Sequence, residues 1–400
     1  MEFRAFYRML VGLLAVSLSC NFINQNPPAT AGNSTAGPTL HPAPTSLPAI
    51  DVENLDQLER LHAYGNVFAQ LFGVSSLPDL NRVAYSRDGR YVALGGCTEY
   101  FNGGDSGRLY CGRSDDPTDD ESAKSFTLIV DAATEELIAS LPDNEPDTTV
   151  TDLAFTHDGS KLFITLYHPD RSELAVWDMA AQQVESELWE DLGYPAIDLS
   201  ADDHWLALDN GFPDESNGKI EVFDLTNDAV IAELPGGFWA PQFSTDGRKL
   251  AAAPPDKFSI YDTGTWTLAS SIGPPCKRCY VALSPDLALL ATSDANQQHA
   301  PVLIWDIASG QQLQSLSAGE NDPSFLYFTP DGSMLWDFMV LDLAVWDTAN
   351  WQLVQRQDPL GPIIPIEQGS GPPRAVHFAG DGRTFLLLTE LDIYLVGVRE

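Results

Sequence analysis

The sequence predicts an all-β protein, a seven-bladed β-propeller. The first reason is a turn motif, Ser or Thr followed by any residue and then Asp-Gly, that recurs inside the same apolar frame. Five copies carry Asp-Gly, the last of them after Ala379-Gly380, and Asp202-Asp203 and Asp286-Leu287 fill the gaps between them. The seven copies place their first aspartates at Asp88, Asp158, Asp202, Asp246, Asp286, Asp331 and Asp381. A period in the forties built from short strands is typical of a propeller.

The second reason is that each copy divides into four short strands. A strand such as Val83–Ser86 precedes the turn, and a mostly apolar strand such as Tyr91–Leu94 follows it. The third strand ends on an aromatic residue and Asp, as in Ala175–Asp178, and a fourth follows, such as Gln312–Leu316. Asp-Gly suits the first turn because Gly adopts a positive φ at little cost and Asp bonds to its own backbone.

The third strands carry three Trp-Asp pairs, at Trp177-Asp178, Trp305-Asp306 and Trp346-Asp347. With the seven turns, they make the chain similar to the WD40-like repeat propeller family from about Leu61 to Glu400. The Gly-His pair that eukaryotic repeats place before the first strand is absent. The chain therefore resembles a divergent, bacterial lipoprotein-type member, and the missing pair argues against transferring the partner-binding habits of eukaryotic repeats to it.

The two ends of the repeat predict how the ring closes. The last copy stops after the strand Asp392–Val396, without a fourth strand. The segment Tyr64–Leu71 has the composition of an outer strand, so we expect it to complete the last blade and remove a sheet edge. Ahead of it, Val52, Leu55, Leu58 and Leu61 recur every three residues. This spacing predicts a short amphipathic helix, with a periodic loop as the alternative.

The first twenty residues predict an export signal of the lipoprotein type. Arg4 and Arg8 precede an apolar run, Met9–Leu18, which is followed by Cys20. Cys20 would carry lipid and become the mature N-terminus, although Ser17 occupies the position where such signals usually have Leu. Cleavage after Ser17-Leu18-Ser19 or Ala29-Thr30-Ala31 by an ordinary signal peptidase, or an uncleaved anchor, are the alternatives. We expect an extracytoplasmic protein anchored to the cell membrane, or otherwise a secreted one.

Composition divides the rest of the chain into two parts. Residues 21–50 hold six prolines among Thr, Ser, Ala, Asn and Gly. Such a segment has too little apolar surface to fold, so we expect a disordered, extended spacer. Residues 51–400 would form the propeller.

The charge limits the partners. The chain has 57 acidic and 21 basic residues, a formal net charge of −36. A phosphate backbone would be repelled, so nucleic acid is excluded, and anionic membrane surfaces are disfavoured apart from the N-terminal lipid. The charge fits a soluble monomer, a basic partner or loosely held divalent cations.

Apart from Cys20, four cysteines remain, at Cys97, Cys111, Cys276 and Cys279. An oxidising compartment favours two local disulfides, Cys97–Cys111 and Cys276–Cys279. A redox pair or half of a zinc site are the alternatives for Cys276 and Cys279. The strand expected directly after them, Tyr280–Leu283, does not provide the helix N-terminus that thioredoxin-type pairs use.

The long connections are predicted to lie on one face and to form the binding face. They follow the second and fourth strands, and Gly95–Lys124 is the largest. Variable loops on a rigid scaffold are where binding usually resides. The candidate residues, which combine carboxylates with aromatic rings, are Asp115, Asp116, Asp119, Asp120, Trp189, Phe212, Phe238 and Trp239. Ordinary solvated loops are the alternative reading.

No catalytic motif, metal-ligand spacing or cofactor fingerprint is found, so no catalytic, metal or cofactor site is predicted. His168 and His299 fall in long connections and could reach a metal or a substrate. The sequence favours a non-catalytic binding or scaffold module at the cell envelope that engages protein, peptide or glycan. The alternatives are a propeller hydrolase or metal-dependent enzyme with its site at the mouth of the central channel, and a purely structural envelope protein.

Overall fold

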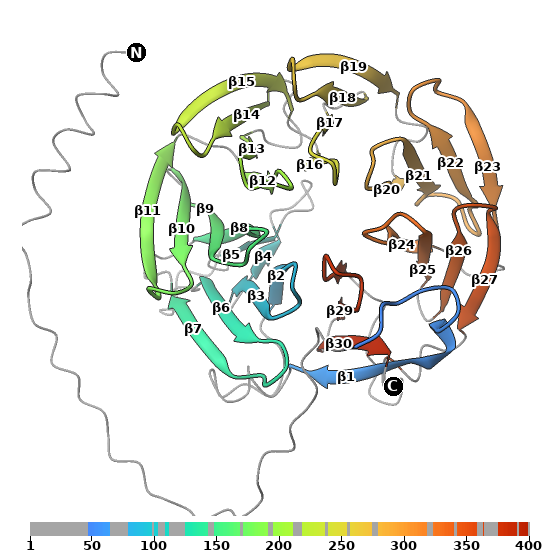
Figure 1. The fold of residues 1–400 in the computed structure, drawn as a ribbon, viewed down its shortest axis with the longest axis horizontal. Coiled ribbons are helices and arrows are strands. Elements are labelled where there is room, and N and C mark those ends of the chain that lie inside the picture. Colours follow the sequence, from blue (N-terminus) through green and yellow to red (C-terminus); the bar gives the residue numbers. More distant parts are fainter. Residues whose placement is uncertain are drawn as a thin grey trace, which may run out of the picture. The chain divides into compact units, whose positions relative to one another are not determined.

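Seven four-stranded antiparallel sheets form the blades of a closed ring, which confirms the predicted propeller (Figure 1). The structure is a computed structural model. It describes residues 47–64, 79–97, 100–102, 109–111, 125–142, 148–168, 171–190, 195–210, 218–236, 239–253, 257–273, 279–317, 323–339, 342–357, 363, 375–389 and 392–398. The ring belongs to one compact unit, His41–Glu400. Among the described residues no helix has the length and hydrophobicity needed to cross a membrane.

The blades follow one another along the chain, and each begins with its innermost strand. Blade 1 contains β2 (Asp79–Tyr85), β3 (Tyr91–Cys97), β6 (Ser125–Asp131) and β7 (Leu137–Pro142). Blade 2 contains β8 (Thr149–Phe155), β9 (Lys161–Tyr167), β10 (Ser172–Asp178) and β11 (Gln183–Glu190). Blade 3 contains β12 (Ala196–Leu199), β13 (Trp205–Asp209), β14 (Lys219–Asp224) and β15 (Ala229–Pro235). Blade 4 contains β16 (Trp239–Phe243), β17 (Lys249–Ala253), β18 (Phe258–Asp262) and β19 (Thr267–Ile272).

The remaining three blades repeat this order. Blade 5 contains β20 (Cys279–Leu283), β21 (Leu289–Asp294), β22 (Val302–Asp306) and β23 (Gln312–Leu316). Blade 6 contains β24 (Pro323–Phe328), β25 (Met334–Met339), β26 (Leu343–Asp347) and β27 (Gln352–Gln357). Blade 7 contains β28 (Ala375–Phe378), β29 (Thr384–Leu388), β30 (Ile393–Val398) and β1 (Leu58–Ala63). A two-stranded hairpin, β4 (Tyr100–Asn102) with β5 (Leu109–Cys111), lies in the connection between β3 and β6.

The ring closes through an N-terminal outer strand, as predicted, but the strand lies earlier in the chain than expected. β1 pairs with β30, with Leu58 opposite Val398, so the closing strand ends before Tyr64. The buried Leu58 packs between blades 6 and 7, and this packing sets the register. The helical element ahead of it is a single 3-10 turn, η2 (Leu55–Gln57), which ends where the strand begins.

The segment before β1 lies against blade 7. Leu47 and Ile50, which the sequence placed in the spacer, are buried. The backbone N–H of Ile50 donates to the carbonyl of Gly382 at 2.9 Å, and the Arg383 guanidinium donates to the Leu47 carbonyl. Residues 47–50 therefore pack on the propeller, although the sequence assigned them to the spacer.

The core consists of apolar clusters between neighbouring blades. The junction of blades 6 and 7 is the most aromatic: Phe378 packs face to face with Phe385 at 5.0 Å and edge to face with Trp336 at 5.1 Å. Because residues alternate along each strand, one side of a sheet packs on the preceding blade and the other on the next. A blade is therefore buried on both faces, which explains the nearly continuous apolar strands in the sequence.

The first turn of each blade is held by its own side chains. In blade 1 the Ser86 hydroxyl donates to Asp88 at 2.7 Å and accepts the Tyr91 N–H at 2.8 Å, while Gly89 has a φ of 69°. Two blades have another residue in the left-handed position, Asp203 with φ 57° and Leu287 with φ 53°. The Leu287 side chain is buried in the core, and that of Asp203 contacts the preceding blade.

The Asp of the Trp-Asp pairs holds the second turn. Asp178 accepts the backbone N–H groups of Ala180 and Ala181 at 2.8 and 2.7 Å. Next to this turn the outer pair of strands has a β-bulge, where the register shifts between Val176 and Trp177, and the other blades have one at a matching place. Bulges twist an exposed edge and hinder its pairing with another strand. The Asp of this motif is therefore structural.

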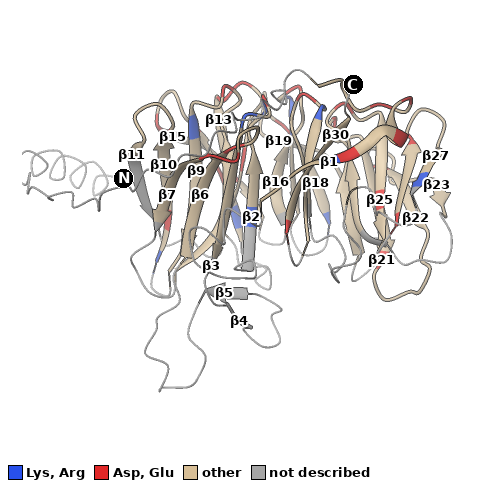
Figure 2. Ribbon diagram, turned by 90° about the horizontal axis from the view of Figure 1, so that it is seen from below, with Lys and Arg blue, Asp and Glu red and all other residues tan. Residues whose placement is uncertain are grey.

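These turns define the two faces of the ring. The turn face carries the short connections between the first and second and between the third and fourth strands of each blade. The loop face carries the other two classes of connection, including the one that holds β4 and β5. Along the described residues of the turn face, at the top of Figure 2, Asp and Glu outnumber Lys and Arg.

Candidate functional site

The predicted binding face falls largely outside the described residues. Asp115, Asp116, Asp119, Asp120, Phe212 and Phe238 all lie there. Trp189 and Trp239 lie in β11 and β16, at the ends of these strands that adjoin the loop face, but their side chains are not described. The backbone thus brings two of the predicted aromatic residues to the predicted face. Whether the rings and carboxylates meet remains a prediction.

The cysteines are described only in part. Cys20 and Cys276 lie outside the described residues. Cys97 ends β3 and Cys111 ends β5, and the side chains of both are undescribed. Cys279, the first residue of β20, is disulfide-bonded. The two predicted pairings, and the lipid at Cys20, remain predictions.

The structure places His168 inside the protein. Its ring is 2% exposed, with Nδ1 3.0 Å from the Thr148 hydroxyl and Nε2 3.3 Å from the Glu173 carboxylate. All three side chains are buried, so this group joins the end of β9 to the start of β10 rather than lining a surface. His299, the other candidate histidine, is exposed and has a φ of 54°.

The structure brings together a polar group that sequence reasoning missed. Arg82, Asp152, Asp198 and His377 lie on the inner strands of blades 1, 2, 3 and 7, which are neighbours around the ring. Electrostatic interactions link Arg82 to Asp152 and His377, and Asp152 to Asp198. In the sequence, each of these residues is visible only as a polar or charged residue within a first strand. Its contact with the next blade follows from the position of that strand at the inner edge of the sheet.

The two aspartates of this inner-strand group join successive blades. Asp152 accepts the backbone N–H of Ile197 at 2.9 Å, and Asp198 accepts that of Phe243 at 2.6 Å. Each bond runs from one inner strand to the next. The inner edge of a blade has no strand beyond it, so its N–H groups need partners from elsewhere. The carboxylates supply them.

Burial and neighbouring charges set the ionisation of the group. Burial, together with the charge of Asp152, raises the pKa of Asp198 to about 7, while the N–H donors oppose this rise. Burial, and then the charge of the Arg82 guanidinium, lower the pKa of His377 to about 4. At neutral pH His377 is therefore uncharged, and Arg82 is the cation that interacts with Asp152.

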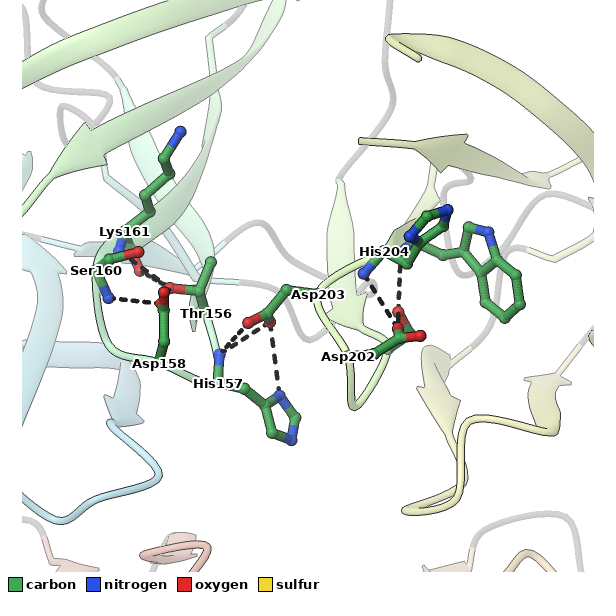
Figure 3. Close-up of polar contacts among 10 residues, drawn as sticks. Thr156, His157, Asp158, Ser160, Lys161, Asp202, Asp203 and His204 are labelled. Atoms are coloured by element: carbon green, nitrogen blue, oxygen red, sulfur yellow. Dashed lines mark hydrogen bonds and ion pairs between the residues drawn. The ribbon is translucent and has the colours of Figure 1, made fainter. Parts of the chain in front are cut away.

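A second polar group lies on the turn face between blades 2 and 3 (Figure 3). Asp203 extends from its turn toward blade 2 and accepts the backbone N–H of His157 with both oxygens, at 2.8 and 2.9 Å. The His157 Nδ1 lies 3.6 Å from the same carboxylate. Burial and then the nearby Arg87 lower the pKa of His157, and Asp203 opposes them. The left-handed Asp203 thus replaces glycine and gains an inter-blade bond.

These contacts join neighbouring blades. Within the described ranges, no group of three or more His, Cys, Asp or Glu side chains could hold a metal ion. Comparison with protein-family models and with curated proteins finds no match to this chain. Propellers commonly serve as binding or scaffold modules, with the variable loops of one face as the binding surface.

Proposed function

We propose that the protein is a lipid-anchored binding or scaffold module of the cell envelope, a WD40-like propeller held outside the membrane by Cys20 and the spacer. It engages a protein, peptide or glycan, with a basic partner favoured, through the loop face. It acts as a monomer and does not bind nucleic acid.

The observation that carries this proposal is the contrast between the two faces. Each first turn of a blade spans five residues between its strands, as in Ser86–Arg90, and its polar groups are bonded within the turn or to the next blade. The connections that can vary in length, such as the one between β3 and β6, all leave from the other face. A rigid ring with variation confined to one face is the arrangement that binding scaffolds use.

Capture from native envelope, with the full-length protein as bait, tests the loop face. A variant with Asp115, Asp116, Asp119 and Asp120 changed to Asn should lose the captured partner, mainly through a slower association rate, because exposed charges steer encounter. Mass spectrometry of the membrane fraction should find lipid on an N-terminal Cys20.

The matched control removes four exposed carboxylates elsewhere, at Glu53, Asp56, Glu185 and Glu233. Asp158 and Asp246 are unsuitable because they hold turns. Equal loss of the partner in the loop variant and in this control would contradict the loop-face assignment. Hydrolysis of an ester or lactone by the purified protein, with no partner captured, would favour the enzyme alternative.

A further inference from the structure

Two tryptophans meet on the turn face where blades 3 and 4 join. Trp205 begins β13, and Trp266 lies in the turn between β18 and β19. Their ring centroids are 5.3 Å apart at 75°, and both rings are partly exposed. The His204 ring, 45% exposed, lies edge-on to Trp205 at 5.8 Å. We call Trp205, Trp266 and His204 the tryptophan surface.

The junction of blades 1 and 2 has a similar stacked pair of aromatic rings. Tyr91 stacks on Phe155 at 6.4 Å and 27°, and Trp205 stacks on Phe243 at 6.5 Å and 26°. Arg90 precedes Tyr91 and places its guanidinium 4.8 Å from the centre of that ring. A cation over an aromatic face is attracted by the ring quadrupole. Blade 1 therefore provides the cation for its own ring.

The tryptophan surface has the ring but not the cation. His204 occupies the place that Arg90 holds in blade 1, directly before the aromatic residue. The cation–π contacts found among the described residues are Arg60 over Tyr394 and Arg90 over Tyr91, and neither involves the two tryptophans. Both indole rings pack on the core of blades 3 and 4 but stay partly exposed, and within the described residues no cation of the chain lies over them.

The backbone at Trp266 is an unusual place for a bulky residue. Its φ is 54°, in the left-handed region that favours glycine or asparagine. In blade 2 the same turn position is held by Gln182, with φ 52°. The same turn in other blades also has a left-handed non-glycine residue, as at Glu135 and Asp228, but there the side chain is small or flexible. Here the side chain provides half of the tryptophan surface.

Two carboxylates lie beside His204. Asp224 lies 3.9 Å from the His204 ring, and hydrogen bonds from Asn227 lower its pKa. Asp202 accepts the His204 N–H; partial burial opposes its ionisation, but the Ser200 hydroxyl and this N–H lower its pKa overall. Both are therefore charged at neutral pH. Arg248, the exposed cation of the neighbouring blade, lies 4.0 Å from Asp246.

We propose that the tryptophan surface is a second binding site, which takes an arginine or lysine side chain of a basic protein segment. The cation lies against the indole faces, as Arg90 lies against Tyr91, and Asp202 and Asp224 supply the opposite charge. The surface is on the turn face, so the site is independent of the loop-face function proposed above.

The test measures the affinity of the full-length protein for a hexa-arginine peptide by calorimetry at low salt. Trp266→Ala leaves the net charge unchanged and should weaken binding by roughly 3- to 10-fold, the size of one exposed or partly desolvated cation–π contact. His204→Arg should weaken binding to a similar extent, because the surface then holds its own guanidinium. A peptide with citrulline in place of arginine should bind far more weakly.

Trp351→Ala is the matched control. Trp351 has the same turn position in blade 6 and a φ of 59°, and it packs on the cluster of blades 5 and 6, where Leu289 begins β21 as Trp205 begins β13. Its replacement should leave the affinity unchanged. If Trp266→Ala does not fold, as judged by circular dichroism, His204→Arg carries the test. Equal binding of the citrulline peptide, an unchanged affinity of His204→Arg, or binding of a chito-oligosaccharide in place of the arginine peptide would overturn the proposal.

Discussion

The junctions of blades 1 and 2 and of blades 3 and 4 share a stacked pair of aromatic rings and differ in the side chains beside it. The stacked pairs Tyr91–Phe155 and Trp205–Phe243 agree in distance and in angle, although they lie in different blades. On the turn face one junction carries its own cation, Arg90, and the other carries His204. The repeat thus sets the geometry, and single side chains next to it decide whether a surface is filled or open.

The same contrast appears at the inner strands. In the first junction Arg82 donates to the carbonyl of Thr151, whereas in the other Asp198 accepts the N–H of Phe243. Between blades 6 and 7 the Tyr327 hydroxyl accepts the N–H of Phe378. A cation, a carboxylate and a phenol therefore perform one task, which is to join neighbouring inner strands. The inter-blade contact is required, but its chemistry is free to vary.

The largest expected effect tests whether the two stacked pairs contribute equally to the free energy of unfolding. Phe155→Ala and Phe243→Ala should each lower the free energy of unfolding by about 3–5 kcal/mol, because each removes a buried ring and leaves a cavity. Chemical denaturation of the two variants measures this. If the two losses in free energy of unfolding differ by more than about 2 kcal/mol, the two stacked pairs do not stabilise the fold equally.

The pH dependence of stability should separate the inner-strand contacts. The pKa of Asp198 is raised from 3.8 to about 7, so the folded state binds its proton more tightly than the unfolded state does. Its contribution is then fully present below about pH 4 and is lost as the pH rises through 7. Relative to Asp198→Asn, the wild-type protein should lose up to a few kcal/mol over this range.

Tyr327→Phe is the control for that experiment. It removes the equivalent acceptor, but the pKa of Tyr327 is about 12, so its effect should not change between pH 4 and pH 7. Parallel pH profiles for the wild-type protein and Asp198→Asn would contradict the assignment.

The smallest expected effect on stability comes from removing the Arg90 guanidinium. Arg90→Ala should lower the free energy of unfolding by about 0.5–1 kcal/mol, because it removes an exposed cation–π contact but keeps the backbone bonds to Ser86 and Asp88. His204→Arg should raise it by a similar amount. The denaturant midpoints of the two single variants measure these changes. A lower midpoint for both variants would show that the two junctions are not equivalent.

Turn chemistry explains how much could be predicted from the sequence. Asp88 with Gly89, and the Asp after each third-strand aromatic residue, act within a few residues, so their spacing revealed the blades and the face of tight turns. The closing strand was harder to place. Both Leu58–Ala63 and the segment from Tyr64 have strand-like composition, and only the packing of Leu58 between blades 6 and 7 selects the first.

The sequence by itself determined the seven blades, the ring closure by an N-terminal strand and the two unlike faces, because hydrogen bonds and φ preferences in turns are local. Tertiary structure alone decided that Asp203 reaches His157, that Asp198 reaches Phe243, and that Trp205 meets Trp266. Each of these contacts joins different blades, across 45 or 46 residues in the two hydrogen bonds. Their partners, burial and pKa values depend on how two separate sheets pack, which no local pattern specifies.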